Sequence, residues 1–201
     1  LREEHGELTR EDIESVGASL VTLDAIKSDL HCHTIASDGK MTLEALVDLA
    51  AAHGYHTIAV TDHSESSITA NGLTAERLRE HIAAIRALDA ARDDITVLAG
   101  SEVDIDAQGG LDYDEELLAE LDIVVASPHI ALGQDASKAT DRLIKAIEHP
   151  AVHIIGHPTG RYVSKRAGLS PDIRALAAAA VEHDVALEIN ARSLIHISEP
   201  T

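Results

Sequence analysis

The chain has 201 residues and a mass of 21.3 kDa, which suits one domain of ordinary size. Its apolar content of 45% and charged content of 25% are those of a globular protein and exclude collagen-like and disordered classes. The net charge of −19 argues against a broad nucleic-acid-binding face, and the lack of any run of about 18 apolar residues excludes a membrane span.

Residues 1–26 are predicted to form a connector that precedes the main domain. This segment is more charged than the rest and contains one modest helix, capped by Thr9, with Ile13, Val16 and Leu20 on one face. Residues 27–201 are predicted to form the domain itself.

Apolar runs typical of buried parallel strands alternate with amphipathic stretches typical of helices through residues 27–201. Six runs predict strands over 28–33, 57–63, 95–104, 122–129, 152–157 and 185–190. Five helices are predicted between them: one closed by Gly54, one capped by Thr74, a short one around Leu117, one capped by Ser137, and one that starts at Ser170-Pro171. This alternation predicts an α/β fold, either a barrel or a doubly wound sheet.

Potential metal ligands stand at the C-terminal end of each predicted strand. Because these ends meet on one face of an α/β fold, we expect their side chains to converge. Side chains two residues apart on a strand point the same way, so His31 and His33 can bind one ion. Imidazoles mixed with carboxylates suit zinc, manganese or iron rather than calcium. The strand-end candidates are Asp29, His31, His33, Asp62, His63, Glu102, Asp104, His129, His157, Glu188 and Asn190.

A structural role is the alternative for each histidine taken singly. A lone histidine at a strand end is more often a hydrogen-bonded structural residue than a ligand. Five histidines and a glutamate on successive strand ends of one sheet favour a metal cluster. Cys32, the only cysteine, is interpreted as a packing residue in a protein of the reducing cytoplasm. The histidines interpreted as structural include His53, His81, His149, His153 and His183.

These motifs, in this order, resemble the PHP (polymerase and histidinol phosphatase) superfamily of metal-dependent phosphoesterases, from about Asp24 to Asn190. The resemblance implies a distorted, TIM-like β/α barrel with seven strands. It also implies three divalent metal ions as cofactors, Mn²⁺ or Zn²⁺, with iron as a further candidate. The metal ligands that it implies are His31, His33, Asp38, His63, Glu102, His129 and His157.

The resemblance also implies how these ligands are shared. His31 and His33 would hold one ion, and Glu102 would bridge it to a second ion held by His129 and His157. Asp38, in the Ser37-Asp38-Gly39 turn, and His63 would hold the third. Such ions lower the pKa of a bridging water and clamp phosphate oxygens, which is the chemistry of phosphoester hydrolysis.

Several charged residues beside this cluster are candidates for supporting roles. Asp29 and Asp62 either orient the imidazole tautomers or cap strand ends. Arg161 lies with Lys165 and Arg166 in the main basic loop. We expect Arg161 to contact substrate phosphate, and a solvated charge run is the alternative. Glu102 and Arg161 are therefore the predicted catalytic residues.

Within the superfamily, the chain is most similar to the C-terminal domain of bacterial family X DNA polymerases. Three stretches carry this similarity: residues 1–7 ahead of 24–27, residues 100–106, and residues 156–161. The resemblance implies a manganese-favouring 3′–5′ exonuclease and 3′-phosphoesterase that processes DNA ends in repair. Its partners would be DNA 3′ ends and a polymerase module of the same parent chain. Two alternatives remain: a stand-alone small-molecule phosphatase of the histidinol-phosphatase type, and a non-catalytic PHP domain that metal ions stabilise.

One departure from the family pattern concerns the C-terminus. The pattern continues after Glu188-Ile189-Asn190 with a helix and a seventh strand, whose Asp-x-His pair supplies one ligand to each of two ions. The chain ends at Thr201, and its tail over 193–201, with His196, matches nothing expected there. We therefore expect a C-terminally incomplete domain of six βα units, with two ions each short of one ligand and with activity in doubt.

Overall fold

A computed structural model describes residues 21–162 and 165–189 of the chain. The helix predicted over 9–20, Asn190 and the tail over 193–201 lie outside these residues. The predictions made for them therefore stay predictions, as does the division of the chain at residue 26.

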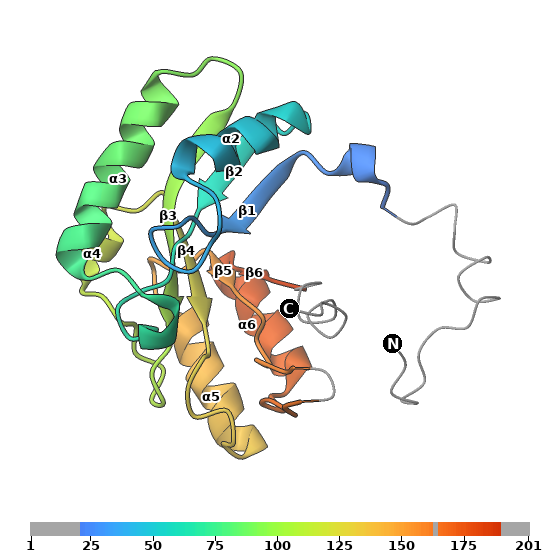
Figure 1. Cartoon of the computed structure of the whole chain (residues 1–201). Coiled ribbons are helices and arrows are strands. Elements are labelled where there is room, and N and C mark those ends of the chain that lie inside the picture. The colour runs from blue at the N-terminus through green and yellow to red at the C-terminus, as the bar shows by residue number, and fades with distance from the viewer. Residues whose placement is uncertain (1–20, 163–164, 190–201) are drawn as a thin grey trace.

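Six parallel strands form one curled sheet in the spatial order β1-β2-β3-β4-β5-β6 (Figure 1). Every strand neighbours the next one along the chain, so the order never reverses as it does in a doubly wound sheet. The sheet is a half-barrel, and the fold is an incomplete TIM-like α/β barrel, in which the described residues form six strands and the five helices between them. The strands are β1 (Ser28–Cys32), β2 (Thr57–Val60), β3 (Thr96–Asp104), β4 (Ile123–Ser127), β5 (Ile154–Ile155) and β6 (Ala186–Leu187).

Helices connect the strands, with α3 packed on β3 and α5 packed against α6 (Figure 1). They are α2 (Leu43–Ala52), α3 (Ala75–Ala90), α4 (Glu115–Leu118), α5 (Ala136–Ile147) and α6 (Ile173–His183), with short 3₁₀ turns at η2 (Leu23–Ala25) and η3 (Ile68–Ala70). None of the helices within the described ranges is long and apolar enough to cross a membrane.

Two predicted helix starts are wrong by two residues. Asp135, rather than Ser137, caps α5, and its carboxylate accepts a hydrogen bond from the backbone N–H of Lys138. Asp172, rather than Ser170, caps α6 and accepts from the N–H groups of two residues in its first turn. A carboxylate at the N-cap also favours the positive end of the helix dipole, which a serine hydroxyl does not. The predicted cap of α3, Thr74, is confirmed.

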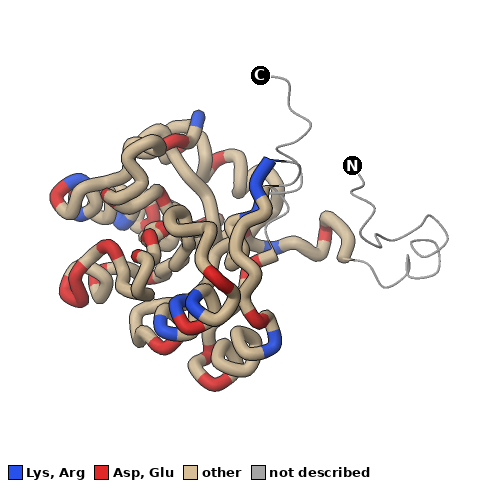
Figure 2. The backbone as a smooth tube through the Cα atoms, turned by 90° about the horizontal axis from the view of Figure 1, so that it is seen from below, with Lys and Arg blue, Asp and Glu red and all other residues tan. Residues whose placement is uncertain are grey.

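The core is aliphatic, as the lack of Phe and Trp requires. Buried leucine, isoleucine and valine side chains from the strands pack against those of the helices, among them Leu78 of α3, Leu143 of α5 and Leu176 of α6. Cys32 belongs to this core, and its burial raises the pKa of the thiol, which suits a packing role. Acidic positions are spread over most elements, with basic positions interspersed singly or in small groups (Figure 2).

The strands are shorter than predicted, and this determines where the functional side chains lie. His31 and Glu102 are within β1 and β3, whereas His63, His129 and His157 follow β2, β4 and β5 in short irregular segments. An isolated parallel bridge joins His63 to Glu102 beyond the end of β2. The segments after the strands therefore extend toward one another over the C-terminal end of the half-barrel.

Helix α6 offers a test of how much its core contact stabilises the domain. Leu176 is fully buried, so we expect Leu176→Ala to lower the free energy of unfolding by about 2–5 kcal/mol. Val181 on the same helix is 85% exposed, and Val181→Ala should change that free energy by about 0.5 kcal/mol or less. Urea unfolding followed by circular dichroism measures both. Equal losses in the two variants would show that α6 does not dock as described.

Candidate metal centre

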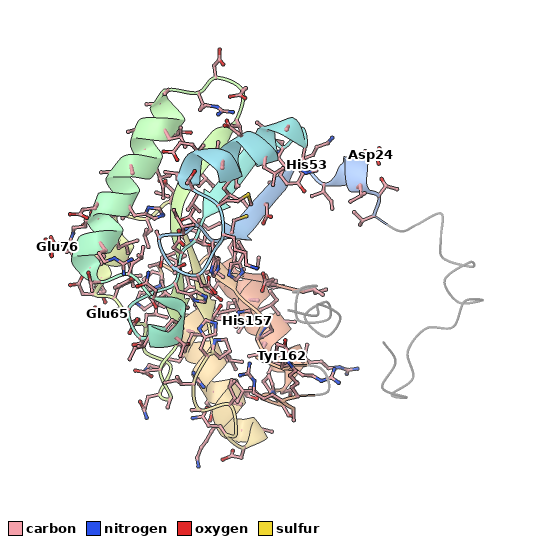
Figure 3. All side chains as sticks on the ribbon, in the orientation of Figure 1. Asp24, His53, Glu65, Glu76, His157 and Tyr162 are labelled. Carbon is pink, nitrogen blue, oxygen red and sulfur yellow. The ribbon has the colours of Figure 1, made fainter. Side chains whose placement is uncertain are left out.

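A pocket of about 540 Å³ opens at the C-terminal ends of the strands. His157 lies toward the middle of the molecule, whereas His53 lies apart at the end of α2 (Figure 3). The pocket brings together all seven predicted metal ligands and the predicted phosphate contact, Arg161. Its lining residues are His31, His33, Asp38, His63, Ser67, Thr69, Ala70, Glu102, His129, His157, Gly160, Arg161, Tyr162 and Arg166.

The Glu102 carboxylate is the centre of this pocket and is only 1% exposed. Five imidazole rings, from the C-terminal ends of the four strands β1, β2, β4 and β5, approach its two oxygens. Oε1 lies 2.7 Å from Nε2 of His157 and 3.3 Å from Nε2 of both His31 and His129. Oε2 lies 3.0 Å from Nδ1 of His63 and 3.3 Å from Nε2 of His33. Three imidazole nitrogens therefore surround one oxygen of this buried carboxylate, and two surround the other.

A second set of carboxylates contacts the outer nitrogens of the same rings. Nδ1 of His31 lies 2.7 Å from Oε1 of Glu188, and Nδ1 of His129 is hydrogen bonded to Asp104. When Nδ1 donates its proton to such a carboxylate, the lone pair of Nε2 faces Glu102. These contacts fix the ring orientation and the tautomer that a metal ligand needs.

The Asp38 carboxylate lies beside the rings of His33 and His63. Its Oδ1 lies 2.8 Å from Nδ1 of His33, and its Oδ2 lies 3.6 Å from Nε2 of His63. The Asp38 side chain is 40% exposed, so it forms part of the open side of the pocket.

The charges of the cluster shift one another's protonation. Burial raises the pKa of Glu102, but the imidazoles around it outweigh burial and hold that pKa well below its ordinary value. Burial lowers the pKa of His31, but Glu102 and Glu188 outweigh it and raise that pKa to about 10. The pKa of His129 rises to about 9 because Asp104 and Glu102 outweigh the effect of burial.

The side chains present fit divalent metal ions. His63 Nδ1 is buried and makes no hydrogen bond, although it lies 3.0 Å from Glu102 Oε2, and His157 Nδ1 is also buried without a hydrogen-bond partner. His63 Nδ1 and Glu102 Oε2 lie close together without a hydrogen bond, which is the arrangement expected of two atoms that bind the same metal ion. Within the described part of the chain, three groups have ligand atoms within 4.8 Å of one another: His31, His33 and Glu102; His33, Asp38 and His63; and His63, Glu102 and His129.

The backbone at His157 is held in an unusual conformation. Its φ of 24° is in the left-handed region, which side chains other than glycine rarely adopt, and its N–H donates to Glu188 Oε2 over 2.7 Å. Glu188 therefore contacts two of the predicted ligands at once, through the imidazole of His31 and the backbone N–H of His157. Glu188 was predicted as a strand-end residue, but these two contacts were not predicted. They are possible because Glu188 directly follows β6, which pairs with β5.

The contacts of Asp62 and Asp29 favour one of their two predicted roles, that of capping strand ends. Asp62 is fully buried, and its hydrogen bonds go to Thr34, Ser37 and His81 rather than to a predicted ligand. Asp29 accepts a hydrogen bond from the backbone N–H of His31, not from its ring. Neither residue lines the pocket: the Asp62 side chain is buried, and the Asp29 side chain is exposed.

The fold and the pocket together define an α/β half-barrel with a histidine and carboxylate cluster at the C-terminal ends of its strands. Residues 29–192 match the PHP domain, and the chain belongs to that family. The expected family and the incomplete TIM-like fold are thus confirmed.

Curated relatives of two kinds are similar to the chain. It is 43% identical over 172 residues to the DNA polymerase/3′-5′ exonuclease PolX of Bacillus subtilis strain 168, a match that covers 86% of this chain and 30% of PolX. It is 34% identical over 166 residues to a probable phosphatase of Shewanella sp. strain MR-4, covering 81% of this chain and 61% of the phosphatase. The chain thus spans less than two thirds of the length of either relative.

A solved structure with the same fold is the histidinol phosphate phosphatase of Lactococcus lactis, which was crystallised with zinc, L-histidinol and phosphate. The TM-score is 0.54 at 19% sequence identity, and the match covers 83% of this chain and 73% of the phosphatase. At this identity the likeness supports the fold alone.

The contact between Glu188 and His31 predicts a measurable change in protonation. In metal-free protein, Glu188→Gln removes one of the two carboxylates that raise the pKa of His31, so that pKa should fall. Titration of the histidine ring signals by NMR, in the presence of a chelator, measures the shift. Glu182→Gln, which changes an exposed glutamate on α6, is the matched control. An unchanged His31 titration in Glu188→Gln would contradict the described contact.

Proposed function

We propose that the chain is a metal-dependent phosphoesterase domain. The observation that carries this proposal is the buried Glu102 carboxylate with five imidazoles around it, in a pocket that also contains Arg161 and Arg166. Metal-ligating groups and guanidinium groups in one pocket suit a doubly charged or singly charged phosphoester.

Three divalent ions, Mn²⁺ or Zn²⁺ with iron as an alternative, are the proposed cofactors. His31, His33 and Glu102 would hold one ion, and His33, Asp38 and His63 another. The third would take Glu102 and His129, with His157 supplying a nitrogen 2.7 Å from the same carboxylate. When bound, such ions acidify water and neutralise the charge of a phosphate group.

The remaining steps fall to the protein's own side chains. Glu102 balances the charge of the ions, and the outer carboxylates keep the imidazole rings oriented. Arg161 is the proposed phosphate contact, because a guanidinium can bind two phosphate oxygens at once. Arg166, whose Nε donates to the carbonyl of Gly160, holds the loop that carries Arg161.

The proposed substrate is the 3′ end of DNA, with the domain acting as a 3′–5′ exonuclease in DNA repair beside a polymerase module of the same parent chain. The similarity to PolX supports this choice over the phosphatases, because its sequence identity is higher (43% against 34%) and its match is slightly longer (172 against 166 residues). The negative net charge suits hydrolysis at a strand end more than binding along a duplex. The single buried cysteine supports a cytoplasmic setting.

A small-molecule phosphatase is the second candidate, because the similarity to probable phosphatases covers a larger share of those proteins. The two candidates differ in whether the phosphorus carries one ester bond or two. The test compares Mn²⁺-dependent release of nucleotides from a 3′-labelled single-stranded DNA with release of phosphate from a phosphomonoester such as p-nitrophenyl phosphate. Faster turnover of the DNA supports the exonuclease. Turnover of the monoester alone would replace it with the phosphatase.

Glu102 is the residue whose loss should be most damaging. We expect Glu102→Gln to lower metal content by at least one ion and to lower activity by about 100-fold or more, because the variant loses the charge that two groups of ligands share. Elemental analysis and the DNA assay measure the two effects. Glu76→Gln, at the exposed first turn of α3, is the control. Metal stoichiometry equal to that of wild type in Glu102→Gln would refute the bridging role.

A further inference from the structure

Asp38 is the one predicted metal ligand that lies neither within a strand nor directly after one. It belongs to the loop over residues 34–39 that follows β1, and its side chain is 40% exposed. A ligand on an exposed loop loses conformational freedom when it binds an ion, unless the loop is already fixed. What fixes this loop therefore bears on how tightly Asp38 can hold an ion.

The first anchor of the 34–39 loop is the buried carboxylate of Asp62. Its Oδ1 accepts from the backbone N–H groups of Thr34 and Ser37 over 2.9 and 3.1 Å and from the Ser37 hydroxyl over 2.5 Å. Its Oδ2 accepts from the Thr34 hydroxyl over 2.8 Å and lies 2.9 Å from Nε2 of His81. The His81 side chain is 11% exposed, so this contact between α3 and the loop anchor is largely shielded from water.

The second anchor is the guanidinium of Arg77, one helical turn before His81 on α3. Its Nη2 donates to the carbonyl oxygen of Ala36 over 2.6 Å, and its Nη1 donates to the carbonyl oxygens of Asn71 and Gly72 over 3.2 and 3.1 Å. Asn71 also donates from Nδ2 to the Ala36 oxygen over 3.0 Å. Arg77 thus ties the middle of the 34–39 loop to the loop that enters α3.

The 34–39 loop has little room to adjust at its end. Gly39 donates to the carbonyl oxygen of Thr34 over 2.9 Å, and a Cβ at Gly39 would lie 2.3 Å from the carbonyl oxygen of His33. The backbone next to Asp38 is therefore packed directly on the residue whose ring Asp38 contacts. A shift of the loop away from α3 would change the separation of Asp38 from both His33 and His63.

We propose that Arg77 and His81 are positioning residues that hold the 34–39 loop so that Asp38 is preorganised for the metal ion it shares with His33 and His63. The inference rests on the proposed function, because it assigns a metal ion to this group. Neither side chain is among the residues that line the metal pocket, so each acts through the loop. Loss of the Arg77 or the His81 contact should lower the affinity for the ion that Asp38 binds. The affinity for ions that only strand-end residues bind should stay unchanged.

The experiment is a Mn²⁺ titration of chelator-treated protein by isothermal calorimetry, with binding steps assigned by variants. Asp38→Ala identifies the step that depends on Asp38. Arg77→Ala should weaken the same step by about ten-fold or more and leave the other steps within about two-fold of wild type. Arg79→Ala is the matched control, because Arg79 lies on the same helix, is exposed and contacts Glu120 instead of the 34–39 loop. It should reproduce the wild-type titration.

His81 provides an independent pair of variants, should Arg77→Ala fail to fold. His81→Gln keeps an N–H group that can reach Asp62 and should retain the Asp38-dependent step, whereas His81→Phe should weaken it. Amide hydrogen exchange of metal-free protein is the second readout: exchange at Ser37, which donates to Asp62, should be faster in His81→Phe than in His81→Gln.

Three results would overturn the inference: Arg77→Ala or His81→Phe with a wild-type titration, equal weakening of every step, or equal effects of Arg77→Ala and Arg79→Ala. Equal weakening of every step would mean that these residues serve overall stability only. The proposed function is judged separately by Glu102→Gln. If that variant binds metal as wild type does, the metal centre itself is refuted, whereas loss of binding in Glu102→Gln with no effect of Arg77→Ala refutes the loop inference alone.

Discussion

One buried carboxylate, that of Glu102, is the interaction on which the rest of the site depends. An isolated buried carboxylate is costly, so it must be matched by positive charge and by donors from several directions. The half-barrel supplies these from the segments after β1, β2, β4 and β5, which meet over β3 because consecutive strands are neighbours. The parallel order of the strands is therefore what allows five imidazoles to share one carboxylate.

The surroundings of this carboxylate are built in layers. Glu188 and Asp104 contact the rings of His31 and His129 from outside. Asp62 lies one step further out and contacts the 34–39 loop and His81 instead of a ring that faces Glu102. The net charge of −19 has a place in this arrangement, since three divalent ions would add about six positive charges at the one point where a phosphate has to approach. Arg161 and Arg166 add to that charge at the edge of the pocket.

The fold class and the meeting of the strand-end residues could be predicted from the sequence, because strand parity and parallel order are local rules. His31 in β1 and His33 directly after it lie on the same side, as alternation predicts, and their Nε2 atoms both face Glu102. Contacts between distant segments could not be predicted in this way. The link from Asp62 to Thr34 and His81 joins the segment after β2, the 34–39 loop and α3, and neither spacing nor periodicity encodes it. The two-residue strands β5 and β6 were overestimated, because an apolar run marks burial better than it marks the length of a hydrogen-bonded ladder.

The central claim is that divalent ions occupy the space between Glu102 and its surrounding imidazoles. Anomalous X-ray diffraction at the manganese absorption edge, from crystals of the protein soaked in Mn²⁺, tests it most directly. The account predicts anomalous peaks within about 2.0–2.3 Å of a Glu102 oxygen and of histidine nitrogens from at least two strand-end segments. Peaks confined to surface carboxylates, with hydrogen-bonded imidazoles and no ion around Glu102, would contradict it.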